Sequence, residues 1–237
     1  MFRSNFAAHL ISPTRKISVV LMLVLLVGAG MFTVANPTVS QAYPKPSVVP
    51  NSWELRFTHS MPKRIIVTAP GTNTPVAYWY MTFSFTNLTD SEQPLLPSFE
   101  MVTKDGTQLR SDRDIPEAAF DSIKKRERNK ALEPMDKIGG RILIGEDQAR
   151  EGVAIWREPS LRMGTFQIFV GGISGESIFL KDGEEVKVKD WTKVSDEERK
   201  SYKTMRKTLQ MVYQIAGDEI KPSEDKVLDK GEEWLMR

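Results

Sequence analysis

The chain has 237 residues, of which 40% are hydrophobic and 27% charged, and it contains no cysteine and only two histidines. This composition is typical of a globular protein and excludes a disordered, collagen-like or disulfide-stabilised chain. The lack of cysteine also excludes thiolate metal sites, cysteine nucleophiles and covalently attached c-type haem. The length favours one domain with an appendage.

The first 42 residues have the layout of a secretory signal. Arg3, Arg15 and Lys16 precede an almost wholly apolar run, Ile17–Val34, and a small-x-small pattern ends at Ala42. We favour a cleaved signal peptide. The alternative is a retained membrane anchor, because this apolar run approaches the roughly 20 residues that span a bilayer. In both cases we expect the remaining chain outside the cytoplasm, in the periplasm, at the cell surface or in the medium. Membrane contact is expected only through residues 17–34, if they are retained.

The leader carries the excess positive charge of the chain. Residues 1–42 hold three of the 33 Lys and Arg and none of the 31 Asp and Glu, so the remainder carries 30 basic and 31 acidic side chains. An almost neutral exported domain has no overall attraction to nucleic acid, and we expect no nucleic-acid partner. The sequence also contains no cofactor-binding motif, so no cofactor is expected.

Residues 53–216 are predicted to form a mainly β domain, preceded by a proline-rich spacer over 43–52. Apolar and polar side chains alternate most clearly over 76–86, which predicts a strand. Many short strands separated by Gly and Pro turns are typical of a β-sandwich, with a barrel as the alternative. The further strands are expected over 53–58, 64–67, 98–104, 107–110, 141–144, 152–156, 165–170, 179–180, 185–188 and 205–215.

A helix is predicted to interrupt these strands over about 116–130. Pro116 suits a first-turn position, and Ala119, Phe120 and Ile123 form one apolar stripe. We therefore expect a sandwich with one inserted helix.

The C-terminal part is expected to add a short helix and an extension. Ser195 and Glu198 have the spacing of a capping box, which predicts a helix from about residue 196. Residues 217–237 are mostly polar and are predicted to form a C-terminal extension.

Several motifs between residues 79 and 175 resemble those of an uncharacterised family of exported bacterial proteins with an immunoglobulin-like β-sandwich domain. These motifs are the aromatic strand 78–82, Asn87-Leu-Thr89, Pro97-Ser-Phe99, the Asp105-Gly106 turn, Gly145-Glu146-Asp147, Gly152-Val-Ala-Ile-Trp156 and Phe169-Val-Gly-Gly172. The resemblance implies an immunoglobulin-like fold and a non-enzymatic protein. The insertion over 114–138 departs from a minimal sandwich.

Two features are candidates for an interaction surface. Tyr78 and Tyr80 lie on one face of the strand 76–86, opposite an aromatic face that would fill the core. They form either a surface patch or a layer packed under the inserted helix, which we favour on burial grounds. The second candidate is a basic stretch that suits an envelope protein or polyanionic surface, or else is a solvated helix face. It consists of Lys124, Lys125, Arg126, Arg128 and Lys130.

Other candidate chemistry is sparse. His59 is the only histidine after the leader, and we interpret it as a surface residue. The acids Asp112, Asp114, Glu184 and Glu185 lack the spacing of a calcium loop, so solvated charges are the favoured interpretation.

Three hypotheses of function follow from this sequence. The leading one is a non-catalytic exported binding or envelope-structural module, with an aromatic or basic patch and no convergent polar pocket. The second is an extracytoplasmic hydrolase with two carboxylates facing across a cleft, one with a raised pKa. The third is a membrane-anchored assembly subunit of an envelope complex.

Overall fold

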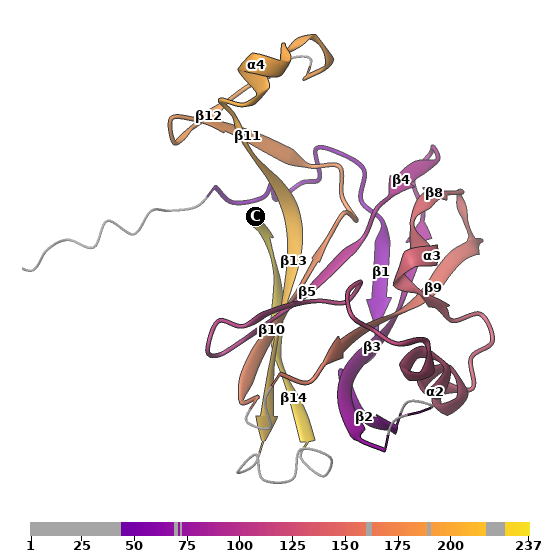
Figure 1. The fold of residues 1–237 in the computed structure, drawn as a ribbon. Coiled ribbons are helices and arrows are strands. Elements are labelled where there is room, and N and C mark those ends of the chain that lie inside the picture. The colour runs from indigo at the N-terminus through magenta and orange to yellow at the C-terminus, as the bar shows by residue number, and fades with distance from the viewer. Residues whose placement is uncertain (1–43, 69–70, 72, 160–162, 189–190, 217–225) are drawn as a thin grey trace, which may run out of the picture. The chain divides into compact units, whose positions relative to one another are not determined.

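The structure is a computed structural model, in which residues 43–237 form one compact unit. It is mainly β, with 54% strand and 12% helix. The predicted signal or anchor lies outside the described residues, and no helix within them is long and apolar enough to cross a bilayer. The structure describes residues 44–68, 71, 73–159, 163–188, 191–216 and 226–237 (Figure 1).

One sheet has five strands and is organised around the long strand β3 (Pro75–Asn87). β1 (Arg56–His59) and β2 (Lys63–Thr68) pair with the C-terminal and N-terminal parts of β3, and β9 (Gly145–Arg157) pairs with β3 along its length, all antiparallel. The short strand β7 (Glu133–Pro134) runs parallel to β9.

A second sheet has seven strands and is organised around β13 (Lys203–Ala216). Its order is β12-β11-β13-β10-β5-β6, and β14 also pairs with β13. The bounds are β5 Ser98–Thr103, β6 Gln108–Arg110, β10 Thr165–Gly171, β11 Ser177–Lys181, β12 Glu184–Val186 and β14 Lys226–Met236.

A two-stranded sheet and four short helical segments complete the described elements. β4 (Gln93–Leu95) pairs with β8 (Gly140–Ile142). The helical segments are α2 Glu117–Glu127, α3 Met135–Ile138, the 3-10 helix η1 Trp191–Lys193 and α4 Asp196–Arg199. The helix predicted from about residue 196 is present as α4, and Ser195 is its N-cap, because the Glu198 amide donates to Ser195 Oγ at 3.3 Å. The Glu198 carboxylate accepts from the Tyr202 hydroxyl at 2.9 Å, so the structure shows one half of the predicted capping box.

The two larger sheets share one hydrophobic core. Aromatic ring pairs join the two sheets. Phe83 of β3 stacks on Phe99 of β5 with their ring centroids 4.5 Å apart, and the ring centroids of Trp79 and of Phe166 on β10 are 5.8 Å apart. Burial of these large aromatic surfaces is the main stabilising contribution to such a core. The alternation over 76–86 thus correctly identified the face of β3 that fills this core.

A second, smaller cluster lies on the opposite face of β3 and β9. Tyr78, Tyr80, Val153 and Ile155 pack there beneath Ala119 and Ile123 of α2. This confirms that the apolar stripe of the inserted helix covers the sheet. α2 ends where Arg128 adopts a left-handed backbone conformation with φ 54°, three residues before the predicted end of the helix.

Both flanks of the predicted domain take part in the structure. Residues 217–237 were expected as a polar extension, but Lys226–Met236 form β14 along one edge of β13. In the proline-rich segment, the Ser47 amide donates to the Glu176 carboxylate at 2.7 Å. The described part of the spacer is therefore held against the domain.

Candidate functional site

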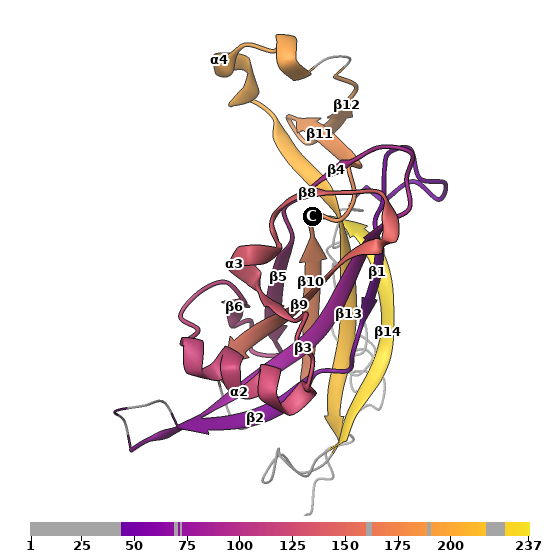
Figure 2. The same ribbon diagram turned by 90° about the vertical axis from the view of Figure 1, so that its right-hand side faces the viewer.

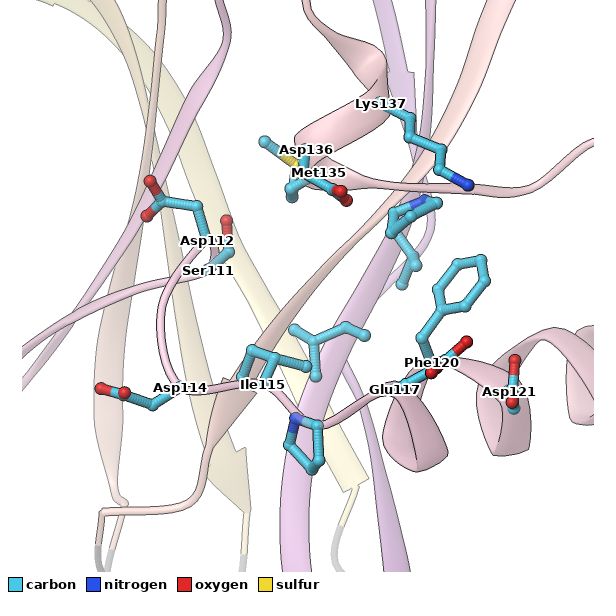
Figure 3. Close-up of a pocket in the computed structure, with 14 residues that line it drawn as sticks. Ser111, Asp112, Asp114, Ile115, Glu117, Phe120, Asp121, Met135, Asp136 and Lys137 are labelled. Atoms are coloured by element: carbon cyan, nitrogen blue, oxygen red, sulfur yellow. The ribbon is translucent and has the colours of Figure 1, made fainter.

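A cavity of about 420 Å³ lies between the inserted helices and the five-stranded sheet (Figure 3). Val153 and Ile155 of β9 line it, on the sheet face away from the main core. The link from β6 to α2 forms one wall, and the first turns of α2 and the segment around α3 form the others. The lining residues are Ser111, Asp112, Asp114, Ile115, Pro116, Glu117, Phe120, Asp121, Pro134, Met135, Asp136, Lys137, Val153 and Ile155.

Carboxylates on three different elements surround this cavity. In Figure 3, Asp112 and Asp114 stand on the link, Glu117 and Asp121 on α2, and Asp136 on α3. All five residues are exposed, and among the described residues that line the cavity Lys137 is the one cation. The lining is therefore acidic and more polar than apolar, and Ile115, Phe120 and Ile155 supply part of its apolar surface.

One of these carboxylates is neutralised within the protein. Arg110 donates two hydrogen bonds to Asp112, at 2.9 and 2.7 Å, and these bonds lower the pKa of the Asp112 carboxyl. No ion pair among the described residues neutralises Asp114, Glu117, Asp121 or Asp136. The cavity therefore has an uncompensated negative charge that favours a cationic group.

A buried hydroxyl adds one further polar group to the wall. Ser111 is only 4% exposed, and its Oγ has no hydrogen-bond partner among the described residues. A buried polar atom without a partner is uncommon in folded proteins.

The acids do not form a metal site. Among the described residues, no group of three or more His, Asp or Glu side chains is arranged to hold a metal ion. Asp112 and Asp114 thus lie at the cavity without the clustered oxygens that Ca²⁺ requires.

The two tyrosines predicted as candidates are buried. Tyr78 is 5% exposed and Tyr80 is fully buried, so neither forms a surface patch. They pack under α2, which confirms the interpretation favoured from the sequence. The sequence could not distinguish the two outcomes, because alternation shows that a strand has two different faces but not what covers each.

The basic stretch is partly used inside the protein. Lys124 Nζ donates to the Leu132 carbonyl at 2.9 Å, and Arg126 donates to the Arg64 carbonyl at 2.8 Å. Lys125, Arg128 and Lys130 are exposed, with no ion pair among the described residues. Arg126 thus joins the insertion to β2, and Lys124 joins α2 to the segment that follows it within the insertion. These two contacts leave a smaller basic surface than the sequence suggests.

His59 is likewise held by local contacts. Its ring stacks on Phe57 at 5.2 Å, and its Nε2 lies 3.6 Å from a Glu232 oxygen. Its Nδ1 lies 3.1 Å from the carbonyl oxygen of Ser60, so backbone and ring contacts account for its position.

Lys207 and two carboxylates form a second charged centre, which no pattern in the sequence predicted. The Lys207 side chain is 5% exposed, and its Nζ lies 2.8 Å from Glu54 and 3.5 Å from Glu176. Burial raises the pKa of Glu176, but the Ser47 hydrogen bonds and the Lys207 charge outweigh it and lower that pKa. A lowered pKa is the opposite of what a general acid needs.

Sequence signals for these two sites differ. The acidic cavity could have been suspected, because Asp112, Asp114, Glu117 and Asp121 fall within ten residues. The Lys207 centre could not, since Glu54, Glu176 and Lys207 are far apart in the chain.

Comparison of this chain with protein-family models, with curated proteins and with solved structures finds no match. The geometry of the molecule itself is therefore the basis for a functional argument.

Proposed function

We propose that this protein is a non-catalytic, extracytoplasmic binding module with an immunoglobulin-like β-sandwich, and that it binds its ligand in the cavity between α2 and α3. The observation that carries the proposal is the set of four carboxylates at the cavity that form no ion pair among the described residues, Asp114, Glu117, Asp121 and Asp136, beside a smaller apolar part of the lining. The leading sequence hypothesis expected no convergent polar pocket, so the proposal keeps its binding role but changes its site.

The position of the cavity supports a binding role. The main core joins the two larger sheets without any residue of α2, whereas the cavity belongs to the insertion. Binding residues commonly lie on segments that a rigid scaffold positions. The layered β scaffold thus supports the cavity, and the insertion supplies its recognition groups.

The chemistry of the lining indicates the class of ligand. The carboxylates attract an amine or guanidinium, and Ile115, Phe120 and Ile155 offer apolar contact to the stem that carries it. A volume of about 420 Å³ accommodates a small molecule or one long side chain. The proposed ligand is therefore a primary amine or guanidinium on a short apolar stem.

The extracytoplasmic location rests on the sequence. Arg3, Arg15 and Lys16 before the apolar run, and the small residues before Ala42, match an export signal. The domain after the leader lacks cysteine and does not depend on disulfides in an oxidising compartment.

A titration of the full-length chain with 1,5-diaminopentane, followed by amide chemical shifts in NMR spectra, tests this function. We expect shifts at residues 111–121 and 134–137, and none with pentanoate or 1-pentanol. The variant Asp114→Asn with Asp136→Asn should bind about 3- to 30-fold more weakly, because exposed charge pairs contribute a few tenths to about 1 kcal/mol each. Glu184→Gln with Glu185→Gln, on β12, is the matched control and should bind normally. Equal responses to the amine and the anion, or binding that the Asp variants leave unchanged, would overturn the proposal.

A further inference from the structure

Exposed aliphatic side chains are concentrated at one end of the β domain. Among the described residues, eight large hydrophobic side chains are exposed, and six of them belong to the segments that meet at this end. Their exposure ranges from 45% to 100%. We call these six the apolar end: Val48, Val49, Leu88, Leu96, Leu143 and Ile144.

Backbone contacts bring four of these side chains together around the β4–β8 sheet. Asn87 forms a bridge with Ile144, which places Leu88 beside it. In β4 and β8 themselves, Leu95 and Ile142 are fully buried, while their neighbours Leu96 and Leu143 are 74% and 45% exposed. Leu95 and Ile142 thus pack inward, whereas Leu96 and Leu143, which follow the two strands at opposite ends of this small sheet, are exposed to solvent.

The proline-rich segment lies at the same end. The loop 172–176 connects the two regions: a side chain at Gly172 would meet the Leu96 carbonyl, and Ile173 accepts a hydrogen bond from the Leu55 amide. Glu176 of that loop binds the Ser47 amide, next to Val48 and Val49. Figures 1 and 2 both show residues 44–52 at the end of the domain that carries β4 and β8.

The charges at this end almost cancel one another. Arg56 pairs with Glu146 at 2.9 Å, and Arg141 pairs with Glu92 at 3.2 Å. Lys45 adds one further positive charge, and Asp90 and Asp147 add two negative charges. The apolar end therefore has no excess of positive charge that would attract anionic lipid, and apolar contact is its dominant property.

The path of the chain indicates what this end faces. The described chain starts at Pro44, and the apolar run 17–34 ends ten residues earlier, at Val34. Residues 35–43 span at most about 30 Å when fully extended. A bilayer that holds 17–34 therefore lies within about that distance of Pro44.

We propose that the apolar end contacts the surface of the bilayer in which residues 17–34 are anchored, with its aliphatic side chains entering the interfacial region. The inference rests on retention of the anchor, and it is independent of a ligand in the acidic cavity. Single aliphatic side chains on a folded domain give shallow, salt-insensitive contact with lipid, unlike basic patches, whose contact weakens with salt.

The absence of cysteine allows a direct test. The full chain is reconstituted into phosphatidylcholine vesicles as the single variants Leu143→Cys, Leu96→Cys and Ile66→Cys, each labelled with the fluorophore NBD. Ile66 is the matched control, because it is 56% exposed but lies on β2, opposite Ala77 at the other end of β3. About ten strand residues separate Ala77 from Asn87, so the control label is roughly 30 Å from the apolar end.

We expect blue-shifted emission for the labels at positions 143 and 96, and at least twofold quenching by brominated phosphatidylcholine that 0.5 M salt does not change. The label at position 66 should behave as in water. Leu88→Asp with Ile144→Asp should abolish quenching at position 96 while the chain still floats with the vesicles. The proposal would be overturned by equal water exposure of the label at all three positions, or by a chain that does not float with the vesicles. It would also be overturned if the labels were shielded without vesicles and the shielding rose with protein concentration. That last result would indicate a second copy of the chain as the partner.

Discussion

Tyr80 of β3 donates a 2.6 Å hydrogen bond to Glu127 in the last turn of α2. Lys63 of β2 donates to the same carboxylate at 2.9 and 3.0 Å. Burial raises the pKa of the Tyr80 phenol far above its ordinary value, and the bond to Glu127 raises it further. These three side chains hold the basic end of the inserted helix on the sheet, next to the apolar contacts that Ala119 and Ile123 make.

The change Tyr80→Phe should therefore destabilise the protein. The hydrogen bond to a largely buried carboxylate is lost, but Glu127 keeps its pair with Lys63, so we expect a loss of about 1–2 kcal/mol in the free energy of unfolding. Tyr78→Phe is the matched control, because the Tyr78 hydroxyl has no partner among the described residues, and it should cost under about 0.5 kcal/mol. Urea denaturation measures both, and equal losses would contradict this account of the contact.

The acid dependence of stability should depend on Glu127. Burial raises the pKa of this carboxyl, but the bonds from Tyr80 and Lys63 and the charges of Lys63 and Arg126 outweigh that effect and lower the pKa below its ordinary value of 4.5. A carboxyl with a lowered folded-state pKa stabilises the protein above its unfolded pKa, and this contribution is lost as the pH falls through the folded-state pKa.

The free energy of unfolding should accordingly decrease between about pH 5 and pH 2. The Glu127→Gln variant should be less stable than the native chain at pH 7, and the gap between them should close toward pH 2. Denaturation at a series of pH values checks this, and curves that stay parallel would show that Glu127 does not contribute.

A buried ion pair fixes β2 against the end of β9. Arg64 donates two 2.7 Å hydrogen bonds to Glu158, and Trp79 Nε1 donates to the same carboxylate at 3.0 Å. The side chains of Arg64 and Glu158 are 9% and 6% exposed. These hydrogen bonds raise the pKa of Arg64 although burial opposes them.

Arg64→Met should cost about 3–5 kcal/mol, because it leaves the Glu158 charge buried without its partner. The double change Arg64→Met with Glu158→Gln removes that charge as well and should recover a large part of the loss. A double-mutant cycle by chemical denaturation measures the coupling between the two sites. If the loss in the free energy of unfolding for the double variant equalled the sum of the losses for the two single variants, the ion pair would not be the source of the effect.

The sequence predicted the strands that have one face packed on the main core. Strands β3, β10 and β13 all appear within two residues of their expected bounds, because alternating burial imposes a period of two on their sequences. The inserted helix was predicted for the equivalent reason, since its stripe of Ala119, Phe120 and Ile123 packs on the sheet.

Strand β14 escaped prediction for a physical reason. It forms an edge of its sheet, and charged side chains such as Lys230, Glu232 and Glu233 alternate poorly with its few apolar residues. Its register with β13 also shifts between Met211 and Tyr213. Charged, irregular edges resist pairing with other chains, but they weaken the pattern from which strands are predicted.

The charged centres show a second limit of prediction from the sequence. Lys207 meets Glu54 and Glu176 only because the loop after β10 and the segment before β1 come together in three dimensions. No periodicity or spacing encodes that encounter. The acidic residues of the cavity are close in sequence, yet only the placement of α3 brings Asp136 to them.

Two glycines with similar backbone angles should respond very differently to alanine. Gly172 has φ +77°, and a Cβ there would fall on the Leu96 carbonyl oxygen, with the Pro97 Cα also 3.3 Å away. Gly183, in the turn between β11 and β12, has φ +88°, and beyond its own and adjacent residues no described atom lies within 4 Å of the position that its Cβ would take. Both changes incur the left-handed strain of roughly 1–2 kcal/mol, which applies to any residue with a Cβ.

Gly172→Ala adds a clash with backbone, which cannot rotate away as a side chain can. We therefore expect it to cost at least about 2 kcal/mol more than Gly183→Ala in the free energy of unfolding. The same clash should displace Leu96 and separate the loop 172–176 from β4, so the label at position 96 should change its emission in solution, whereas Gly183→Ala should leave it unchanged. Similar losses for the two variants would show that the loop accommodates a Cβ, and that the contact between Gly172 and Leu96 does not determine how this end of the domain is held.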